Sequence, residues 1–154
     1  MKIVETHKLR KTYHFGDVEV NALHEVDLVI EDAEFIAVWG PSGSGKTTLC
    51  NLIGLLDSPT SGEVVIKDTA AANLSDAQLS ELRNESIGFV FQNFNLVPVL
   101  SALENVMLPL QVQGVARKEA AERAAKLLEE VELGDRRNHR PSKMSGGQQQ
   151  RVAI

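Results

Sequence analysis

The sequence predicts an α/β domain, and three patterns along its 154 residues carry that prediction. Apolar and polar side chains alternate over much of the first 30 residues, most clearly at 18–20 and 26–30, with the period of a half-buried sheet. Two short runs, 35–39 and 87–91, are almost entirely apolar, as expected of strands covered on both faces. From residue 93 onward the periodicity becomes helical.

The composition is that of an ordinary globular domain, with 43% hydrophobic and 24% charged residues. A formal net charge of −5 leaves no surplus of Lys and Arg to neutralise nucleic-acid phosphates, so no nucleic-acid partner is expected. The charged start at 1–6 is unlike a signal peptide, and no apolar run approaches the roughly 18 to 20 residues that cross a bilayer. The single cysteine, Cys50, is expected to be a small core residue.

An antiparallel β unit is predicted from residues 1–34 together with 58–70. In its second part, the Ser, Pro, Thr and Gly of 58–62 are typical of a turn, and a strand follows at 63–67. A short polar helix is then expected over 75–85.

A core is predicted from residues 35–57 together with 86–92. The apolar strand 35–39 runs into a glycine-rich loop, after which a helix is expected over 46–56. The second apolar run, 87–91, is expected to be the other buried strand of this core.

The rest of the chain is predicted to be helical. Ser101 and Glu104 have the spacing of a capping box, and Pro109 is expected to bend or end the helix that they begin. A second helix is expected over 117–132, with Gly134 as its C-terminal cap. Its apolar stripe comprises Ala120, Ala124, Leu127, Leu128 and Val131.

The pattern G-x-x-x-x-G-K-[ST] occupies residues 40–47, between a predicted buried strand and a predicted helix. Glycines let the backbone curl so that its amides point at phosphates, and the helix that follows adds its positive end. Lys46 is expected to reach the outer phosphates, and Thr47 to hold Mg²⁺. The ATP-binding residues predicted in this segment are Gly40, Pro41, Ser42, Gly43, Ser44, Gly45, Lys46, Thr47 and Thr48.

Three further motifs resemble those of the ATP-binding cassette (ABC) family. The run from Met144 to Ile154, which begins MSGGQ, resembles the signature of that family, and Gln92 matches its Q-loop. Tyr13 stands about 27 residues before Gly40, where the family places an aromatic residue that stacks on adenine. The resemblance implies a P-loop NTPase with an incomplete RecA-like core, and it gives Gln92 a role in sensing Mg²⁺ and the γ-phosphate.

The signature segment also has the chemistry of a second phosphate site. Ser145 is a good helix N-cap, and Gly146 and Gly147 leave the amides at that helix end accessible. The resemblance implies a head-to-tail homodimer in which each copy's signature contacts the ATP held by the other copy. The signature residues expected to make this contact are Ser145, Gly146, Gly147 and Gln148. The helical subdomain, 93–154, would then end in the signature helix.

The resemblance also implies a transmembrane permease as partner, reached at the cytoplasmic face of the inner membrane. Two segments, 52–64 (LIGLLDSPTSGEV) and 100–110 (LSALENVMLPL), look most like cassettes of the lipoprotein-releasing and macrolide-exporting type. The transported substrate does not follow from these residues, because specificity in the family resides mainly in the permease.

The chain contains no Asp-Glu dipeptide, although the resemblance implies that one should end an apolar strand after the signature and be followed by a switch histidine. Two segments come near to this pattern. Asp57 cannot take the place of the dipeptide, because it lies too far along the predicted helix from Lys46. The apolar run that ends in Glu-Asp at 28–32 precedes the phosphate loop instead of following the signature. No catalytic residue is therefore expected within the chain, which should bind ATP, hydrolyse it poorly and expose apolar surface. The four histidines are expected on the surface or on strands: His7, His14, His24 and His139.

Three other functions stay open at this point. A nucleotide-binding module without hydrolysis is compatible with every motif described. A soluble ABC protein of DNA repair or translation is disfavoured, because Met144 comes only 52 positions after Gln92, which leaves no room for a coiled-coil insertion. A phosphoryl-transferring kinase is disfavoured by the signature.

Overall fold

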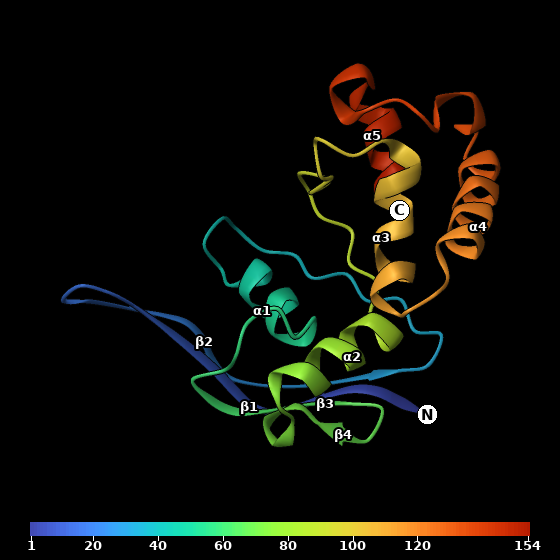
Figure 1. Ribbon diagram of the computed structural model, residues 1–154. Coiled ribbons are helices and arrows are strands. Elements are labelled where there is room, and N and C mark those ends of the chain that lie inside the picture. The colour runs from blue at the N-terminus through green and yellow to red at the C-terminus, as the bar shows by residue number, and fades with distance from the viewer. The chain divides into compact units, whose positions relative to one another are not determined.

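The computed structural model describes all 154 residues and divides them into two compact units, 1–87 and 88–154. Figure 1 shows the elements of both units along the chain. Each unit has hydrophobic core residues of its own.

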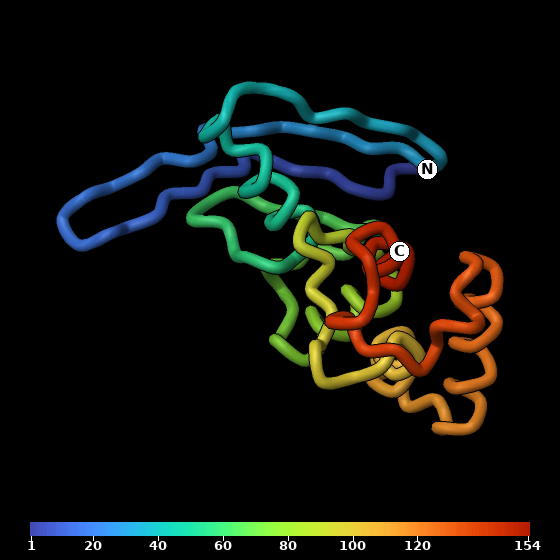
Figure 2. Tube along the Cα trace, turned by 90° about the horizontal axis from the view of Figure 1, so that it is seen from above, coloured from blue at the N-terminus to red at the C-terminus, as the bar shows by residue number.

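The first unit contains a four-stranded antiparallel sheet in the order β2-β1-β3-β4, which confirms the predicted antiparallel β unit. Its strands are β1 (Lys2–Phe15), β2 (Val18–Glu31), β3 (Ser61–Ile66) and β4 (Thr69–Ala70). Pairing between β1 and β3 stops at Arg10, whereas β1 and β2 stay paired as far as Phe15 and Val18. The two long strands therefore continue past the rest of the sheet as a two-stranded arm (Figures 1 and 2).

Two helices pack against this sheet, α1 (Lys46–Ile53) and α2 (Asp76–Ser86), and a short turn of 3₁₀ helix, η1 (Ala71–Asn73), lies between β4 and α2. Leu52 of α1 and Leu55 just after it are buried with Leu9 and Leu23 of the hairpin. The alternation in the strands produces this core, since every second side chain points to the helix side. Ser75 caps α2 through a capping box with Gln78, so the predicted polar helix is confirmed.

The two apolar runs expected to be core strands form no strand in the structure, and this prediction is wrong at the level of the elements. Phe35 and Trp39 are 93% and 92% exposed, and Val90 in the second run is 55% exposed. An extended segment becomes a strand only when a neighbour supplies ladder hydrogen bonds. The four-stranded sheet includes neither 35–39 nor 87–91, so their backbones have no ladder to join.

The second unit is helical, as predicted. It contains α3 (Ala102–Val112), α4 (Arg117–Glu130) and α5 (Gly146–Ala153), with two 3₁₀ turns between the last two, η2 (Gly134–Arg136) and η3 (Pro141–Lys143). The capping box of Ser101 and Glu104 begins α3, whose helix continues past Pro109 to Val112 rather than ending there. Leu128, Leu133 and Val152 bring α4, the following loop and α5 into one core.

The end of α4 differs from the prediction. Val131, not Gly134, is the C-cap, and Glu132 takes the left-handed conformation with φ 61°. Leu133 then donates to the carbonyl of Leu128 at 2.7 Å and is 1% exposed. Burying this leucine offsets the left-handed backbone of a non-glycine residue.

The apolar stripe of α4 is narrower than the sequence suggested. Ala120, Ala124 and Leu128 are buried, but Leu127 is 49% exposed. Leu127 lies one position before Leu128, about 100° around the helix, and so falls at the edge of the packed face.

None of the helices has both the length and the apolar character that crossing a bilayer requires.

Candidate nucleotide-binding site

The phosphate-loop motif forms a tight turn that leads directly into α1. Ser44 donates its amide to the carbonyl of Pro41 at 3.3 Å, and Gly45 is the N-cap of the helix with φ 86°. A Cβ at Gly45 would lie 2.5 Å from the Ala22 carbonyl oxygen, so the loop packs against β2 at this point. The absence of a side chain at Gly45 therefore allows both the left-handed turn and the close approach to the strand.

The Lys46 side chain curls back over the loop. Its Nζ donates to the carbonyl oxygens of Gly40 and Pro41, both at 2.8 Å. Lys46 is half-buried, whereas residues 41–44 are exposed to solvent. An anion that enters the loop therefore meets a held ammonium charge rather than a freely moving one.

The start of α1 supplies amides to the same place. The first intrahelical bond runs from the Leu49 amide to the Gly45 carbonyl, at 2.8 Å. The amides of Lys46, Thr47 and Thr48 precede it and have no partner within the helix, as at every helix N-terminus. Together with the positive end of the helix dipole they make an anion site of the kind that phosphates occupy.

The start of α1 also offers an oxygen ligand for a magnesium ion that arrives with a nucleotide. Mg²⁺ keeps several waters and takes few protein ligands besides phosphate oxygens. Thr47 lies in the first turn of α1 and is exposed, so its hydroxyl can serve as one such ligand. No group of three or more His, Cys, Asp or Glu side chains is placed to hold a metal ion by protein ligands alone.

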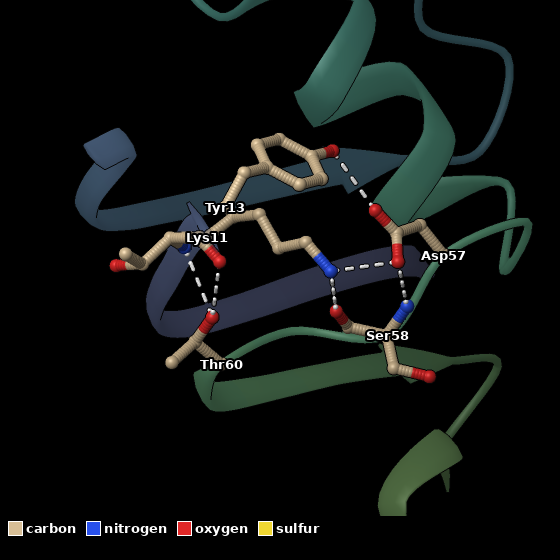
Figure 3. Close-up of polar contacts among 6 residues, drawn as sticks. Lys11, Tyr13, Asp57, Ser58 and Thr60 are labelled. Atoms are coloured by element: carbon tan, nitrogen blue, oxygen red, sulfur yellow. Dashed lines mark hydrogen bonds and ion pairs between the residues drawn. The ribbon is translucent and has the colours of Figure 1, made fainter. Parts of the chain in front are cut away.

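Tyr13 lies on β1 and belongs to a polar cluster that sequence reasoning did not find (Figure 3). Its hydroxyl donates to Oδ2 of Asp57 at 2.9 Å, and Lys11 Nζ donates to Oδ1 of Asp57 at 2.7 Å. Lys11 Nζ also lies over the Tyr13 ring, 4.9 Å from its centroid. Because Asp57 is 44 residues from Tyr13 in the chain, no local spacing could have signalled the contact.

The Asp57 carboxylate is ionised in this setting. Burial by itself would raise the pKa of Asp57, but hydrogen bonds from Lys11, Tyr13 and the Ser58 amide outweigh burial and hold the pKa below its ordinary value. Both oxygens of Asp57 accept hydrogen bonds from these neighbours.

Gln92 and the signature residues belong to the second unit. Gln92 is exposed in a turn closed by the Phe94 amide, which donates to the Phe91 carbonyl at 3.1 Å. Ser145 caps α5, accepting from the Gln148 amide and donating its own amide to Gln148 Oε1.

The glycines that follow Ser145 are open to solvent. A Cβ at Gly146 or Gly147 would meet no atom within 4 Å. The serine expected to cap the signature helix does so, and the two residues after it leave this helix end accessible.

Two expectations about side chains near these segments are wrong. Cys50 is exposed rather than in the core, because Leu52, two positions and about 200° further around α1, takes the buried place. His139 is half-buried in a loop, and its Nδ1 is buried without a hydrogen-bond partner. The other histidines, His7, His14 and His24, lie exposed on strands as expected.

The fold and the loop define an α/β nucleotide-binding protein of the phosphate-loop class. The chain belongs to the ABC transporter family, whose model matches residues 23–154.

Two curated relatives illustrate the match. The macrolide export ATP-binding/permease protein MacB of Syntrophobacter fumaroxidans is 47% identical over 100% of this chain and 22% of its own length. The lipoprotein-releasing system ATP-binding protein LolD of Syntrophus aciditrophicus is 45% identical over 99% of this chain and 68% of its own length. The chain spans about two thirds of the length of several other curated relatives.

A solved structure also resembles the chain closely. The ATP-binding cassette MJ0796, in a dimeric post-hydrolysis state bound to ADP and Pi, superposes with a TM-score of 0.89 at 46% identity. The match covers 98% of this chain and 67% of that one. MJ0796 is a protein of Methanocaldococcus jannaschii.

Proposed function

We propose that this chain is the nucleotide-binding part of an ABC transporter subunit, which binds ATP with Mg²⁺ on residues 40–48. The observation that carries the proposal is the Lys46 ammonium, held over a glycine-rich turn at the start of α1. In this arrangement Lys46 pairs with the outer phosphates, Thr47 ligates Mg²⁺, and Tyr13 stacks on adenine. Gln92 contributes to sensing Mg²⁺ and the γ-phosphate.

A homodimer completes the site in this proposal. Residues 145–148 of one copy contact the ATP held by residues 40–48 of the other, which produces two equivalent sites related by a two-fold axis. The accessible start of α5 supports this role, because an anion can approach the amides beside Gly146 and Gly147. The dimeric state of the MJ0796 cassette supports it as well.

The partner in the membrane is a permease subunit, met at the cytoplasmic face of the inner membrane. An apolar cavity of about 870 Å³ in the second unit offers a surface for such a partner. Phe91, Phe94 and Leu110 are among its lining residues, and Gln92 lies between the first two in the chain. Release of a lipoprotein or export of a macrolide is the transport reaction suggested by the relatives.

Hydrolysis by this chain alone is proposed to be slow. The sequence contains no Asp-Glu dipeptide to activate a water molecule, and Asp57, which lies too far along the chain from Lys46 to replace it, is bound to Lys11 and Tyr13. Steady-state phosphate release, measured with saturating ATP and Mg²⁺, tests this point. A turnover that Lys46→Ala abolishes would contradict it.

The binding proposal is tested by Lys46→Ala with the Kd for ATP and Mg²⁺ as the measurement. Losing one charge-assisted contact to phosphate should raise the Kd by about 10- to 100-fold. Lys118→Ala is the matched control, because Lys118 is an exposed lysine on α4 of the second unit. An unchanged Kd in Lys46→Ala, or an equal change in both variants, would refute the phosphate loop as the binding site.

A further inference from the structure

Asp57 lies just after α1, the helix that follows the phosphate loop, and connects this part of the chain to the arm of the sheet. Leu52 and Leu55, buried in the core of the first unit, fix the chain just before it. From there Asp57 reaches two residues of β1, Lys11 and Tyr13, as Figure 3 shows. One carboxylate thus connects the chain segment that continues the phosphate loop with the residue proposed to stack on adenine.

The cluster is built more tightly than a surface ion pair. Lys11 Nζ donates to Asp57 at 2.7 Å and to the Ser58 carbonyl oxygen at 2.6 Å, and its side chain is only 13% exposed. The Ser58 amide donates to Asp57 Oδ1 at 2.8 Å. Beside it, the Thr60 hydroxyl accepts the Thr12 amide at 2.9 Å, and the Thr60 amide donates to the Arg10 carbonyl at 2.9 Å, so the turn after α1 is also bound to β1 through the backbone. Such multiply bonded, partly buried carboxylates hold their geometry, unlike isolated exposed pairs.

The Tyr13 ring is consequently held at two places. Its hydroxyl is bound to Asp57 Oδ2, and one face of the ring lies under the Lys11 ammonium. The Phe15 ring lies nearby as well, with its centroid 6.3 Å from that of Tyr13 and its plane tilted by 36°. A base would therefore stack on the part of the Tyr13 ring that Lys11 and Phe15 leave open. Fixing the ring before the nucleotide arrives lowers the entropy cost of stacking, which is how preorganisation increases affinity.

We propose that Asp57 is a positioning residue for the base of the nucleotide, acting through the hydroxyl of Tyr13 rather than through the phosphates. This inference rests on the proposed function, since it assigns to Asp57 a share of the affinity for ATP. The inference does not concern the phosphate loop, whose contacts with the phosphates come from other residues.

The test compares two ligands that share a triphosphate chain, of which only ATP carries the adenosine. The Kd values for ATP and for inorganic tripolyphosphate, each with Mg²⁺, are measured for the wild type, Asp57→Ala, Tyr13→Phe and the double variant. Asp57→Ala should raise the Kd for ATP by about five-fold and leave that for tripolyphosphate within about two-fold. Tyr13→Phe keeps the ring and loses only the hydroxyl, so it should reproduce this selective loss, and the double variant should add little to it.

A matched control is Asp27→Ala. Asp27 accepts the Lys8 amide at 2.7 Å on the same hairpin, away from Tyr13, and its loss should change neither Kd. Equal losses for both ligands in Asp57→Ala would overturn the inference, because they would mean that Asp57 only supports the loop. An Asp57→Ala effect that persists undiminished in the Tyr13→Phe background would overturn it too.

The outcomes also separate this inference from the proposed function. A wild type that binds neither ligand would refute both. A wild type that binds tripolyphosphate as tightly as ATP would keep the phosphate site of the proposed function. It would refute the stacking role of Tyr13 and, with it, the inference, because the adenosine would then contribute nothing for Asp57 to position.

Discussion

Two glycines of the phosphate loop, Gly43 and Gly45, share a left-handed backbone but not a common environment. Gly43 has φ 80° and Gly45 has φ 86°. An added Cβ at Gly43 would meet nothing within 4 Å, whereas one at Gly45 would lie 2.5 Å from the Ala22 carbonyl oxygen and 2.9 Å from Leu23 Cδ2. The two positions therefore separate the effect of backbone strain from that of steric contact.

Gly45→Ala should lower the free energy of unfolding by about 3 kcal/mol, because the left-handed cost and the clash with β2 add together. Gly43→Ala should lower it by about 1 kcal/mol, the cost of the backbone conformation alone. Denaturant unfolding of the two variants beside the wild type measures both values. Equal losses would show that the contact with β2 does not constrain the loop.

Asp57 also makes the stability depend on pH. Its pKa lies below the ordinary value in the folded chain, so the unfolded chain binds the proton more readily. The stabilisation is therefore present at pH 7 and is lost as the pH falls below about 4. Asp57→Asn should lose less stability than the wild type between pH 7 and pH 3, as measured by the shift of the denaturant midpoint. A larger loss in the variant would contradict the sign of the pKa shift.

The starts of helices are marked in the sequence by signals that involve only neighbouring residues. Three helices begin with a serine that exchanges hydrogen bonds with the residue three positions later: α2, α3 and α5. In α3, hydrogen bonds from the Ser101 amide and hydroxyl lower the pKa of Glu104, consistent with a carboxylate that accepts at the helix start. These boxes are readable from the sequence because both partners lie within one turn.

The C-terminal end of α4 allows the left-handed residue that follows a helix to be tested. Glu132 has φ 61°, and its side chain is 89% exposed, with only a weak contact to Arg151 at 3.4 Å. Glu132→Gly should raise the free energy of unfolding by about 0.5 to 1 kcal/mol, since glycine accepts this backbone without strain. Glu122→Gly, at an exposed position in the middle of α4, is the control and should lower it by about 1 kcal/mol. Thermal or denaturant unfolding distinguishes the two, and a loss in both variants would contradict the left-handed cap.

At the scale of the whole molecule, the apolar run before the phosphate loop is open to solvent. Trp39 is the only tryptophan of the chain and is 92% exposed, and Phe35, four positions earlier in the same run, is 93% exposed. Exposed clusters of this kind favour association with other apolar surfaces. The expectation that the chain exposes apolar surface is met at these residues, while aggregation stays a prediction.

The fluorescence of Trp39 measures whether this apolar run is exposed to solvent. Its fluorescence should have the emission maximum of free tryptophan and should be quenched by iodide nearly as well as free tryptophan amide, because water reaches the indole on most sides. A dye specific for hydrophobic surface should bind the chain as well. A blue-shifted emission that iodide does not quench, together with a cooperative melt and no dye binding, would show that this run is covered.

Much of the fold could be predicted from the sequence. Alternation predicted strands within residues 1–30, and the box of Ser101 placed a helix start, because these signals depend on neighbours within a few residues. The core strands at 35–39 and 87–91 could not be judged in the same way. A continuous apolar run says that a segment can be buried, but whether it becomes a strand depends on a partner elsewhere in the chain.

The candidate site divides in the same manner. The sequence by itself determined the glycine-rich turn, the lysine after it and the helix that follows, since a contiguous stretch sets the backbone conformation and places the charge. Only the tertiary structure decided that Lys11, Tyr13 and Asp57 meet, because the sheet and α1 bring together residues more than 40 positions apart. A hydrogen bond requires its two atoms to lie about 3 Å apart in space, whatever their separation along the chain. The spacing of residues in the sequence therefore does not reveal which distant residues meet.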